Sequence, residues 1–268
     1  MLRVHYALLI KRIIVINKNN FWGTTLIYSV GFLSLRAISF LLLPIYTNLL
    51  NTKEAGYVFI LYTIIAFFNT IYSHGMDSSL LKFYKSDNSQ KIITTSISYS
   101  FIYGCLLSIL LYFLNQPLQY FSDIVVYTTN QLALFILIIL FCDMLSSRLM
   151  TIIRLLEKPF YFLVVSFINV AVSVCLNIYL IKVLNMGFGG VLLSLVGVAI
   201  VQLLILLPLI LFNINLKLFD YSLLKKMIIF SIPFLPASIF FIMIEMADRL
   251  MLGWLSSIEN VGLYGAGY

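Results

Sequence analysis

Charged residues inside apolar segments are the residues of this chain best suited to do chemistry. Glu245, Asp248 and Arg249 interrupt an apolar stretch that covers 227–254, and Arg36 and Asp143 interrupt two others. An ionised side chain at the centre of a membrane-spanning helix costs about 2.5–3.5 kcal/mol on insertion scales. Such side chains therefore face protein or water, and they are the first candidates for binding an ion or a charged substrate.

Arg36 lies about 21 Å along its apolar stretch at 1.5 Å per residue, which is too deep for its guanidinium to reach the interface easily. Its partner is either a carboxylate such as Asp143, in a structural pair, or an anionic substrate group such as a phosphate, which a guanidinium grips through paired N–H donors. Glu245 and Arg249 are four residues apart and can pair along one helix. Asp248 and Arg249 lie close enough to an interface to reach water.

Polar residues recur at helical spacing in four of the apolar stretches. At 100° per residue, each set occupies a limited arc of its helix. The sets are Thr25, Ser29, Arg36 and Ser39; Tyr62, Asn69, Ser73 and Asp77; Ser166, Asn169, Ser173 and Asn177; and Ser231, Ser238, Glu245 and Arg249. Within a membrane, such stripes either hydrogen-bond helices to one another or line water. Four stripes together favour a shared hydrated cavity.

The composition determines the class of protein. Of 268 residues, 62% are hydrophobic and 10% are charged, against about 25% charged in a typical soluble domain. The mean hydropathy is +1.05. We therefore predict an all-α, polytopic membrane bundle, because helices satisfy their own backbone in lipid. Seven complete spans are expected at 22–46, 56–77, 93–114, 130–153, 160–180, 189–212 and 227–254, and an eighth begins at Gly262.

The basic residues predict the orientation. Only Lys53 and Lys182 fall on the side away from the amino terminus. The other side receives Arg3, Lys11, Arg12, Lys18, Lys82, Lys85, Lys91, Arg148, Arg154, Lys158, Lys217, Lys225 and Lys226. Since cytoplasmic loops collect Lys and Arg, the amino terminus is predicted to be cytoplasmic. The net charge of +7 therefore reflects membrane topology and not a nucleic-acid partner.

Signals for catalysis or a resident cofactor are weak. His5 and His74 belong to no metal-ligand pattern, and the three cysteines, Cys105, Cys142 and Cys175, sit within apolar runs. The sequence has no glycine-rich phosphate loop, nucleophile elbow or His-Glu-x-x-His motif. We therefore expect no enzyme and no cofactor. The short outside loops also argue against a membrane polymerase, which usually carries a large one.

Two local features carry further expectations. Pro233 and Pro236 each remove a helix hydrogen bond and should kink the seventh span, as a fixed bend or as a hinge for alternating access. Asp77 and Lys82 stand together at the cytoplasmic end of the second span. We expect them to form an interfacial cluster.

Five segments of the chain carry a resemblance to a known family. They are Leu-Pro-Ile-Tyr-Thr-Asn-Leu-Leu-Asn-Thr-Lys-Glu-Ala-Gly-Tyr at 43–57, Ser-His-Gly-Met-Asp-Ser-Ser-Leu-Leu-Lys-Phe-Tyr at 73–84, Ile-Pro-Phe-Leu-Pro at 232–236, Ala-Asp-Arg-Leu-Met-Leu-Gly-Trp-Leu at 247–255 and Glu-Asn-Val-Gly-Leu-Tyr at 259–264. These segments resemble bacterial polysaccharide flippases, the Wzx-type transporters of the multidrug/oligosaccharidyl-lipid/polysaccharide superfamily. The resemblance implies two six-helix lobes that move undecaprenyl-pyrophosphate-linked sugars from the inner to the outer leaflet of the bacterial inner membrane. It also implies membrane lipids, a polysaccharide polymerase and a chain-length regulator as partners.

The resemblance and the stripes together assign roles to named residues. Arg36, helped by Arg249, is expected to attract the lipid pyrophosphate. The side chains expected to contact sugars are Asn69, Ser73, Asn169 and Asn177, and those expected to couple transport to an ion are Glu245, Asp248 and Asp143.

The resemblance also divides the chain. A basic leader is expected at 1–21, a first lobe at 22–212, a cytoplasmic linker at 213–226 and the start of a second lobe at 227–268. A trace of the repeat is visible, since Leu49 to Tyr57 matches Leu255 to Leu263 at one offset. The chain corresponds to about the first half of the family pattern, so we expect an amino-terminal fragment of a longer transporter. A drug or cation antiporter of the same superfamily and an inactive remnant stay open as alternatives.

Overall fold

The computed structural model describes residues 21–84, 88–114 and 128–267, and this part of the chain is helical, without a strand. When helices separated only by a short break are counted as one, seven helical stretches of this part are long and apolar enough to cross a membrane. The all-α membrane bundle predicted from composition is thereby confirmed. The predicted leader lies almost entirely outside the described residues.

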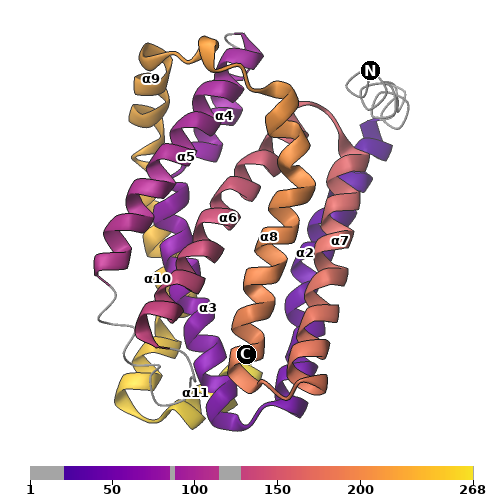
Figure 1. The fold of residues 1–268 in the computed structure, drawn as a ribbon, viewed down its shortest axis with the longest axis vertical. Coiled ribbons are helices and arrows are strands. Elements are labelled where there is room, and N and C mark those ends of the chain that lie inside the picture. The colour runs from indigo at the N-terminus through magenta and orange to yellow at the C-terminus, as the bar shows by residue number, and fades with distance from the viewer. Residues whose placement is uncertain (1–20, 85–87, 115–127, 268) are drawn as a thin grey trace.

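The described helices run up and down the bundle in chain order (Figure 1). They are α2 (Phe21–Leu49), α3 (Thr52–Ser73), α4 (Met76–Phe83), α5 (Ser89–Phe113), α6 (Thr129–Leu155), α7 (Pro159–Asn177), a π-helical turn (Ile178–Val183), α8 (Gly187–Asn213), a short 3-10 turn (Leu216–Leu218), α9 (Tyr221–Ser231), α10 (Phe234–Leu255) and α11 (Ile258–Gly267). The eighth span begins at Ile258, ahead of the expected Gly262.

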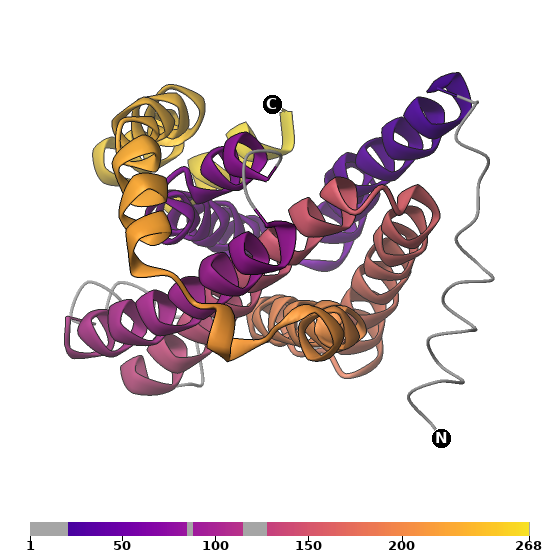
Figure 2. The same ribbon diagram turned by 90° about the horizontal axis from the view of Figure 1, so that it is seen from above.

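The helices pack in two groups around α6. Viewed from above, α2 and α7 lie on one side, and α9, α10 and α11 lie on the other (Figure 2). Helix α6 packs on α5, α8 and α3, and its Leu140, Met144 and Leu145 belong to the larger apolar core. A second apolar core gathers near α4 and α9, where Met76 and Met227 are fully buried. The bundle therefore holds two separate apolar centres, one toward each end.

The second span is broken, contrary to the continuous helix that we expected over 56–77. His74 and Gly75 have φ angles of 35° and 71°, in the left-handed region, and they separate α3 from α4. Glycine adopts this conformation at no steric cost, whereas a side chain at that position is strained. The break changes the direction in which Asp77 and the rest of α4 leave the end of α3.

The seventh span is broken as well, between Ser231 and Phe234. Pro233 is the N-cap of α10, so the kink expected there is confirmed. Pro236 lies in the first turn of α10, where a backbone N–H has no helical partner. The carbonyl to which its missing N–H would have bonded is that of Ile232, which lies at the same break, so Pro236 is compatible with this kink and adds no second one.

The two breaks pack directly on each other. A Cβ atom added to Gly75 would lie 2.7 Å from the Cβ of Phe234 and 2.7 Å from the carbonyl oxygen of Ser231. Beside this contact, the Ser79 hydroxyl donates to the carbonyl oxygen of Met227 at 2.9 Å. The bends of the second and seventh spans are thus joined at one point.

The matching segments of the sequence adopt matching structures at the opposite end. Helix α2 ends at Leu49 and α10 ends at Leu255, and α3 and α11 then begin at Thr52 and Ile258. The side chain of Asn51 caps α3 by accepting from the Glu54 N–H at 2.8 Å, and Ser257 accepts from the Asn260 N–H at 3.3 Å. Both helix ends and caps therefore fall at equivalent positions of the two segments.

The two matching helices also cross each other reciprocally. A Cβ atom at Gly56 would overlap the carbonyl oxygen of Ile258, and a Cβ atom at Gly262 would overlap that of Thr52. The contacting positions exchange when α3 and α11 are interchanged, as in a two-fold contact. We call this contact the glycine crossing.

Candidate binding site

A polar pocket of about 440 Å³ opens where the break between α3 and α4 faces α6 and α10. Ligand pockets typically measure about 300–1,000 Å³. Its described lining residues are Asn69, Thr70, Ser73, Gly75, Asp77, Ser78, Asp143, Met144, Ser147, Phe234 and Ser238. Most of these offer a hydroxyl, amide or carboxylate group, so the pocket is suited to a ligand with many hydrogen-bonding groups.

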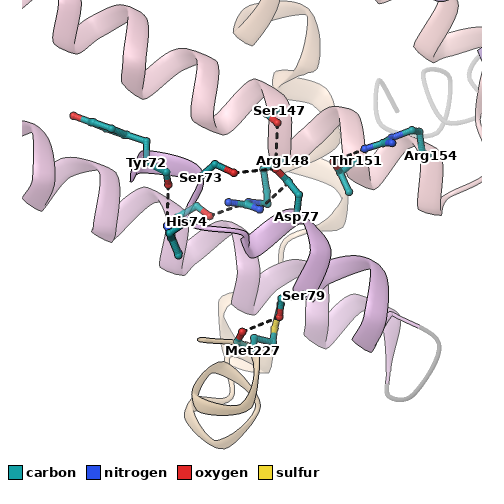
Figure 3. A network of polar contacts seen from close by, with 11 residues as sticks. Tyr72, Ser73, His74, Asp77, Ser79, Ser147, Arg148, Thr151, Arg154 and Met227 are labelled. Carbon is teal, nitrogen blue, oxygen red and sulfur yellow. Dashed lines mark hydrogen bonds and ion pairs between the residues drawn. The ribbon is translucent and has the colours of Figure 1, made fainter. Parts of the chain in front are cut away.

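An ion pair forms one wall of the pocket. Nη1 of Arg148 donates to Oδ1 of Asp77 at 2.7 Å (Figure 3). The Arg148 side chain is 1% exposed, against 25% for Asp77, and its Nε donates to the hydroxyl of Ser100 at 3.2 Å. The hydroxyls of Ser73 and Ser147 donate to Oδ2 of Asp77 at 3.4 and 3.3 Å. The charge of Asp77 is therefore balanced by a cation that lies behind the pocket wall.

This ion pair corrects two expectations. Asp77 does not form a cluster with Lys82, because Arg148 is its partner and the Lys82 ammonium lies over the ring of Phe230. Arg148 is not a loop residue, because it lies inside α6 and is buried. The prediction of orientation counts Arg148 among the loop residues, because it uses the positions of Lys and Arg in the sequence and takes no account of burial.

A second carboxylate contributes to the pocket from α6. Nδ2 of Asn69 donates to Oδ2 of Asp143 at 3.4 Å, which joins α3 to α6. Among the described residues, no ion pair joins Asp143 to Arg36. The pocket thus brings together three of the side chains to which the sequence assigned a role in transport, Asn69, Ser73 and Asp143, and it also includes Asp77 and Ser238 from the polar stripes.

The stripe of the fifth span lies elsewhere and packs helices together. Nδ2 of Asn169 donates to Oε1 of Gln202 on α8 at 2.6 Å. Asn177 is buried and accepts from the hydroxyl of Tyr46 on α2 at 3.1 Å. Each amide therefore bonds to a side chain on a neighbouring helix, so this stripe follows the packing alternative and does not line the described part of the pocket.

The remaining charged candidates also lie outside the described lining of the pocket. Arg36 and Glu245 are exposed on α2 and α10. The guanidinium carbon of Arg249 lies 5.7 Å from the centre of the Phe59 ring, and Asp248 accepts from the hydroxyl of Tyr264 on α11 at 2.5 Å. Arg249 and Asp248 therefore belong to the contacts of α10 with α3 and α11.

His74 lies behind the pocket and was not anticipated from the sequence. Its Nδ1 is 2.9 Å from the carbonyl oxygen of Tyr72, and its ring packs against Tyr103 and Tyr99 at centroid distances of 4.5 and 5.6 Å. The sequence feature that could have pointed to His74 is the following Gly75, because His74 and Gly75 together form the break between α3 and α4. In the described part of the chain, no group of three or more His, Cys, Asp or Glu residues is arranged to hold a metal ion.

Comparison with known proteins gives one match. A family model described as "Polysaccharide biosynthesis protein" matches residues 21–268. Neither a curated protein nor a solved structure matches the chain.

Proposed function

Because this chain belongs to the polysaccharide biosynthesis protein family, the family of Wzx-type flippases, we propose that it moves undecaprenyl-pyrophosphate-linked oligosaccharides between the leaflets of a bacterial inner membrane. It is a multi-pass membrane protein with a transporter's role in polysaccharide synthesis. The observation that most supports a lipid-linked oligosaccharide as the substrate is the polar pocket inside the helical bundle. The chain that forms this bundle belongs to a polysaccharide biosynthesis family.

The proposed orientation has a cytoplasmic amino terminus, which puts the loops around α4 and α9 in the cytoplasm as well. The polar pocket then lies in the cytoplasmic half of the bundle and the glycine crossing lies at the outer end. A substrate made in the cytoplasm reaches the pocket without passing the crossing. The proposed lobes, 22–212 and 227–268, are supported by the reciprocal contact of α3 and α11.

Each group of residues has a proposed role. Asn69, Ser73 and Asp143 hydrogen-bond sugar hydroxyls in the pocket, and Asp143 also exchanges an ion, for which Glu245 and Asp248 are further candidates. Arg36, near mid-length of α2, and Arg249, near the outer end of α10, contact the pyrophosphate. Asn169 and Asn177 support the site indirectly, because they hold α7 against α8 and α2. A polysaccharide polymerase and a chain-length regulator are the proposed protein partners.

Proteoliposomes test the transport proposal. A polyprenyl-diphosphate-linked oligosaccharide is placed in both leaflets, and its outer sugars are removed by an added glycosidase. With the chain present, the protected fraction should then fall with time as inner-leaflet sugars reach the outside. Protection equal to that of protein-free liposomes would contradict the proposal.

The role of Arg36 has its own test. Arg36→Ala in the producing cell should abolish surface polysaccharide while the amount of inserted protein stays normal, because the pyrophosphate loses its paired donors. Unchanged surface polysaccharide would remove Arg36 from the path.

A drug or cation antiporter is the second candidate, and one observation favours it. The described lining of the pocket contains two carboxylates and no Lys or Arg, which suits a cationic ligand. The same liposomes distinguish the two functions when they are loaded with a lipophilic dye cation. Dye efflux without movement of the lipid-linked sugar would favour the antiporter.

A further inference from the structure

A second hollow, which we call the lysine groove, lies beside the polar pocket, where α4 packs against α9 and the start of α10. Its volume is about 460 Å³. Its described lining residues are Lys82 and Phe83 of α4, Lys226, Ile229 and Phe230 of α9, and Pro233 and Phe234 at the start of α10. The groove therefore has an apolar surface, and Lys82 and Lys226 are its two basic lining residues.

The two lysines of the groove are available for an anion. Both side chains are exposed, and no carboxylate in the described part of the chain forms an ion pair with either. Nζ of Lys82 lies 3.8 Å from the centre of the Phe230 ring and 5.5 Å from that of Phe83. An aromatic face holds an ammonium without using its N–H donors fully. The Lys82 ammonium is thus held beside the groove, and its N–H groups can still donate hydrogen bonds to an anion.

The groove and the polar pocket are neighbours that differ in their charged residues. Phe234 lines both of them, and its ring lies 5.4 Å from that of Phe230. On the pocket side of Phe234 lie Asp143 and Asp77, the latter paired with Arg148, and on the groove side lie Lys82 and Lys226, which form no ion pair among the described residues. The groove therefore offers a diphosphate two unpaired lysines, whereas the lining of the pocket offers it no cation. Uncharged sugar hydroxyls suit the pocket.

We propose that the lysine groove holds the diphosphate of a polyprenyl-linked sugar while the sugar occupies the polar pocket, an inference that rests on the proposed function. The first isoprenoid units then lie on the apolar side chains of Ile229, Pro233 and Phe230. The ligand bends around Phe234, which separates its charged part from its sugars. Arg36 and Arg249 are reached only later, on the way to the outer end.

Binding measurements on the full chain in nanodiscs of neutral lipid test this placement. The probes are a polyprenyl diphosphate that carries the oligosaccharide, the same lipid without sugar, and phosphatidylglycerol. The variant is Lys82→Gln with Lys226→Gln, and the matched control is Lys225→Gln, an exposed neighbour on α9 outside the groove. A second variant, Lys82→Arg with Lys226→Arg, keeps both charges.

The double glutamine variant should bind the polyprenyl diphosphate about tenfold or more weakly, with or without sugar, since two charge-assisted contacts are lost. The control and the double arginine variant should bind as the wild type does, and the loss should shrink at high salt. Unchanged affinity of the glutamine variant would overturn the placement and leave the proposed function standing. Equal competition by phosphatidylglycerol would overturn it too, because the groove would then belong to a membrane phospholipid. A wild-type chain that binds none of the sugar-linked lipid would remove the proposed function and, with it, this inference.

Discussion

The two ends of the second span meet the seventh and eighth spans in opposite ways. At the start of α3, Gly56 and Gly262 bring two backbones together with no room for a side chain. At the end of α3, the chain breaks at His74 and Gly75 and leaves a pocket of about 440 Å³ against α10. The second span is therefore closed against the eighth span at one end and leaves a hollow against the seventh span at the other.

The difference follows from the residues at each end. Glycines lower the separation of two helices, and the crossing then needs no polar partner. The hollow end carries charges, which must be paired or hydrated in a membrane protein. The ion pair of Asp77 and Arg148, with its serine donors, occupies the wall there. In the proposed function, a polar ligand enters at the hollow end and is excluded from the closed end.

Removing the ion pair should have the largest effect on the hollow end. Asp77→Ala leaves the buried Arg148 without its counter-charge, and the expected loss of stability is about 3–5 kcal/mol. Asp77→Leu combined with Arg148→Met should recover most of that loss, because the buried charge is gone. Thermal unfolding in detergent measures both. A double variant as unstable as the single one would show that the pair is not the support of this wall.

Filling the closed end should have the next largest effect. Gly262→Ala puts a methyl group onto the carbonyl oxygen of Thr52, and forcing the helices apart costs roughly 2–3 kcal/mol. Gly267→Ala, on the same helix and open to space, should be neutral or slightly stabilising. The same unfolding measurement compares them. Equal stability of the two variants would contradict the crossing.

The joined breaks should respond more weakly. Gly75→Ala meets Phe234 and the Ser231 carbonyl and is strained at φ 71°, so we expect a loss of roughly 1–2 kcal/mol. Gly75→Asn separates the causes, because asparagine tolerates the left-handed conformation but still carries a Cβ atom. If asparagine restores stability in full, strain alone explains the loss and the contact between the breaks carries none of it.

An ion pair between the first turn of α5 and the N-cap of α9 should give the smallest effect, and this effect depends on pH. Nζ of Lys91 lies 2.5 Å from Oδ2 of Asp220, and this contact, with the Leu223 N–H, holds the pKa of Asp220 well below its usual range. A lowered carboxyl pKa stabilises the fold above the unfolded value of about 4 and loses that contribution as the pH falls through the folded value. Lys91→Met should therefore be less stable than the wild type at pH 7, by less than the variants above. The difference should shrink below pH 4, as followed by unfolding at a series of pH values, and a constant difference would contradict the assignment.

The sequence predicted the closed end better than the hollow one. Apolar length gave the spans, and the match of Leu49–Tyr57 with Leu255–Leu263 pointed to Gly56 and Gly262, although not to their contact. Helical spacing brought out Asn69 and Ser73, and a charge inside an apolar stretch brought out Asp143; these three side chains do meet in the pocket. The spacing of polar residues predicts which face of a helix is polar, because the residues of one face recur at the helical period.

The neighbours of each face could not be predicted. The stripe around Asn169 has the same spacing as the one around Asn69, yet it meets Gln202 and packs, because a pattern on one helix does not specify the helix opposite. Arg148 was missed as the partner of Asp77 for the same reason. The break at His74 was missed because an isolated glycine is compatible with a helix, and only its tertiary contact with Phe234 explains its conformation.

The most direct test of the central claim is the reactivity of a cysteine in the pocket. Ser147→Cys is introduced into a chain whose three native cysteines are replaced by alanine. Asn260→Cys, at the closed end, is the matched control in the same background. Each variant is treated with a membrane-impermeant maleimide, and the labelling rate is measured. In inverted vesicles, we predict that Cys at Ser147 is labelled and that the polyprenyl-diphosphate-linked oligosaccharide slows the labelling, while Cys at Asn260 is labelled only in right-side-out vesicles and is not protected. Labelling of the Ser147 position from the outer side, or at a rate that the sugar-linked lipid leaves unchanged, would contradict the account.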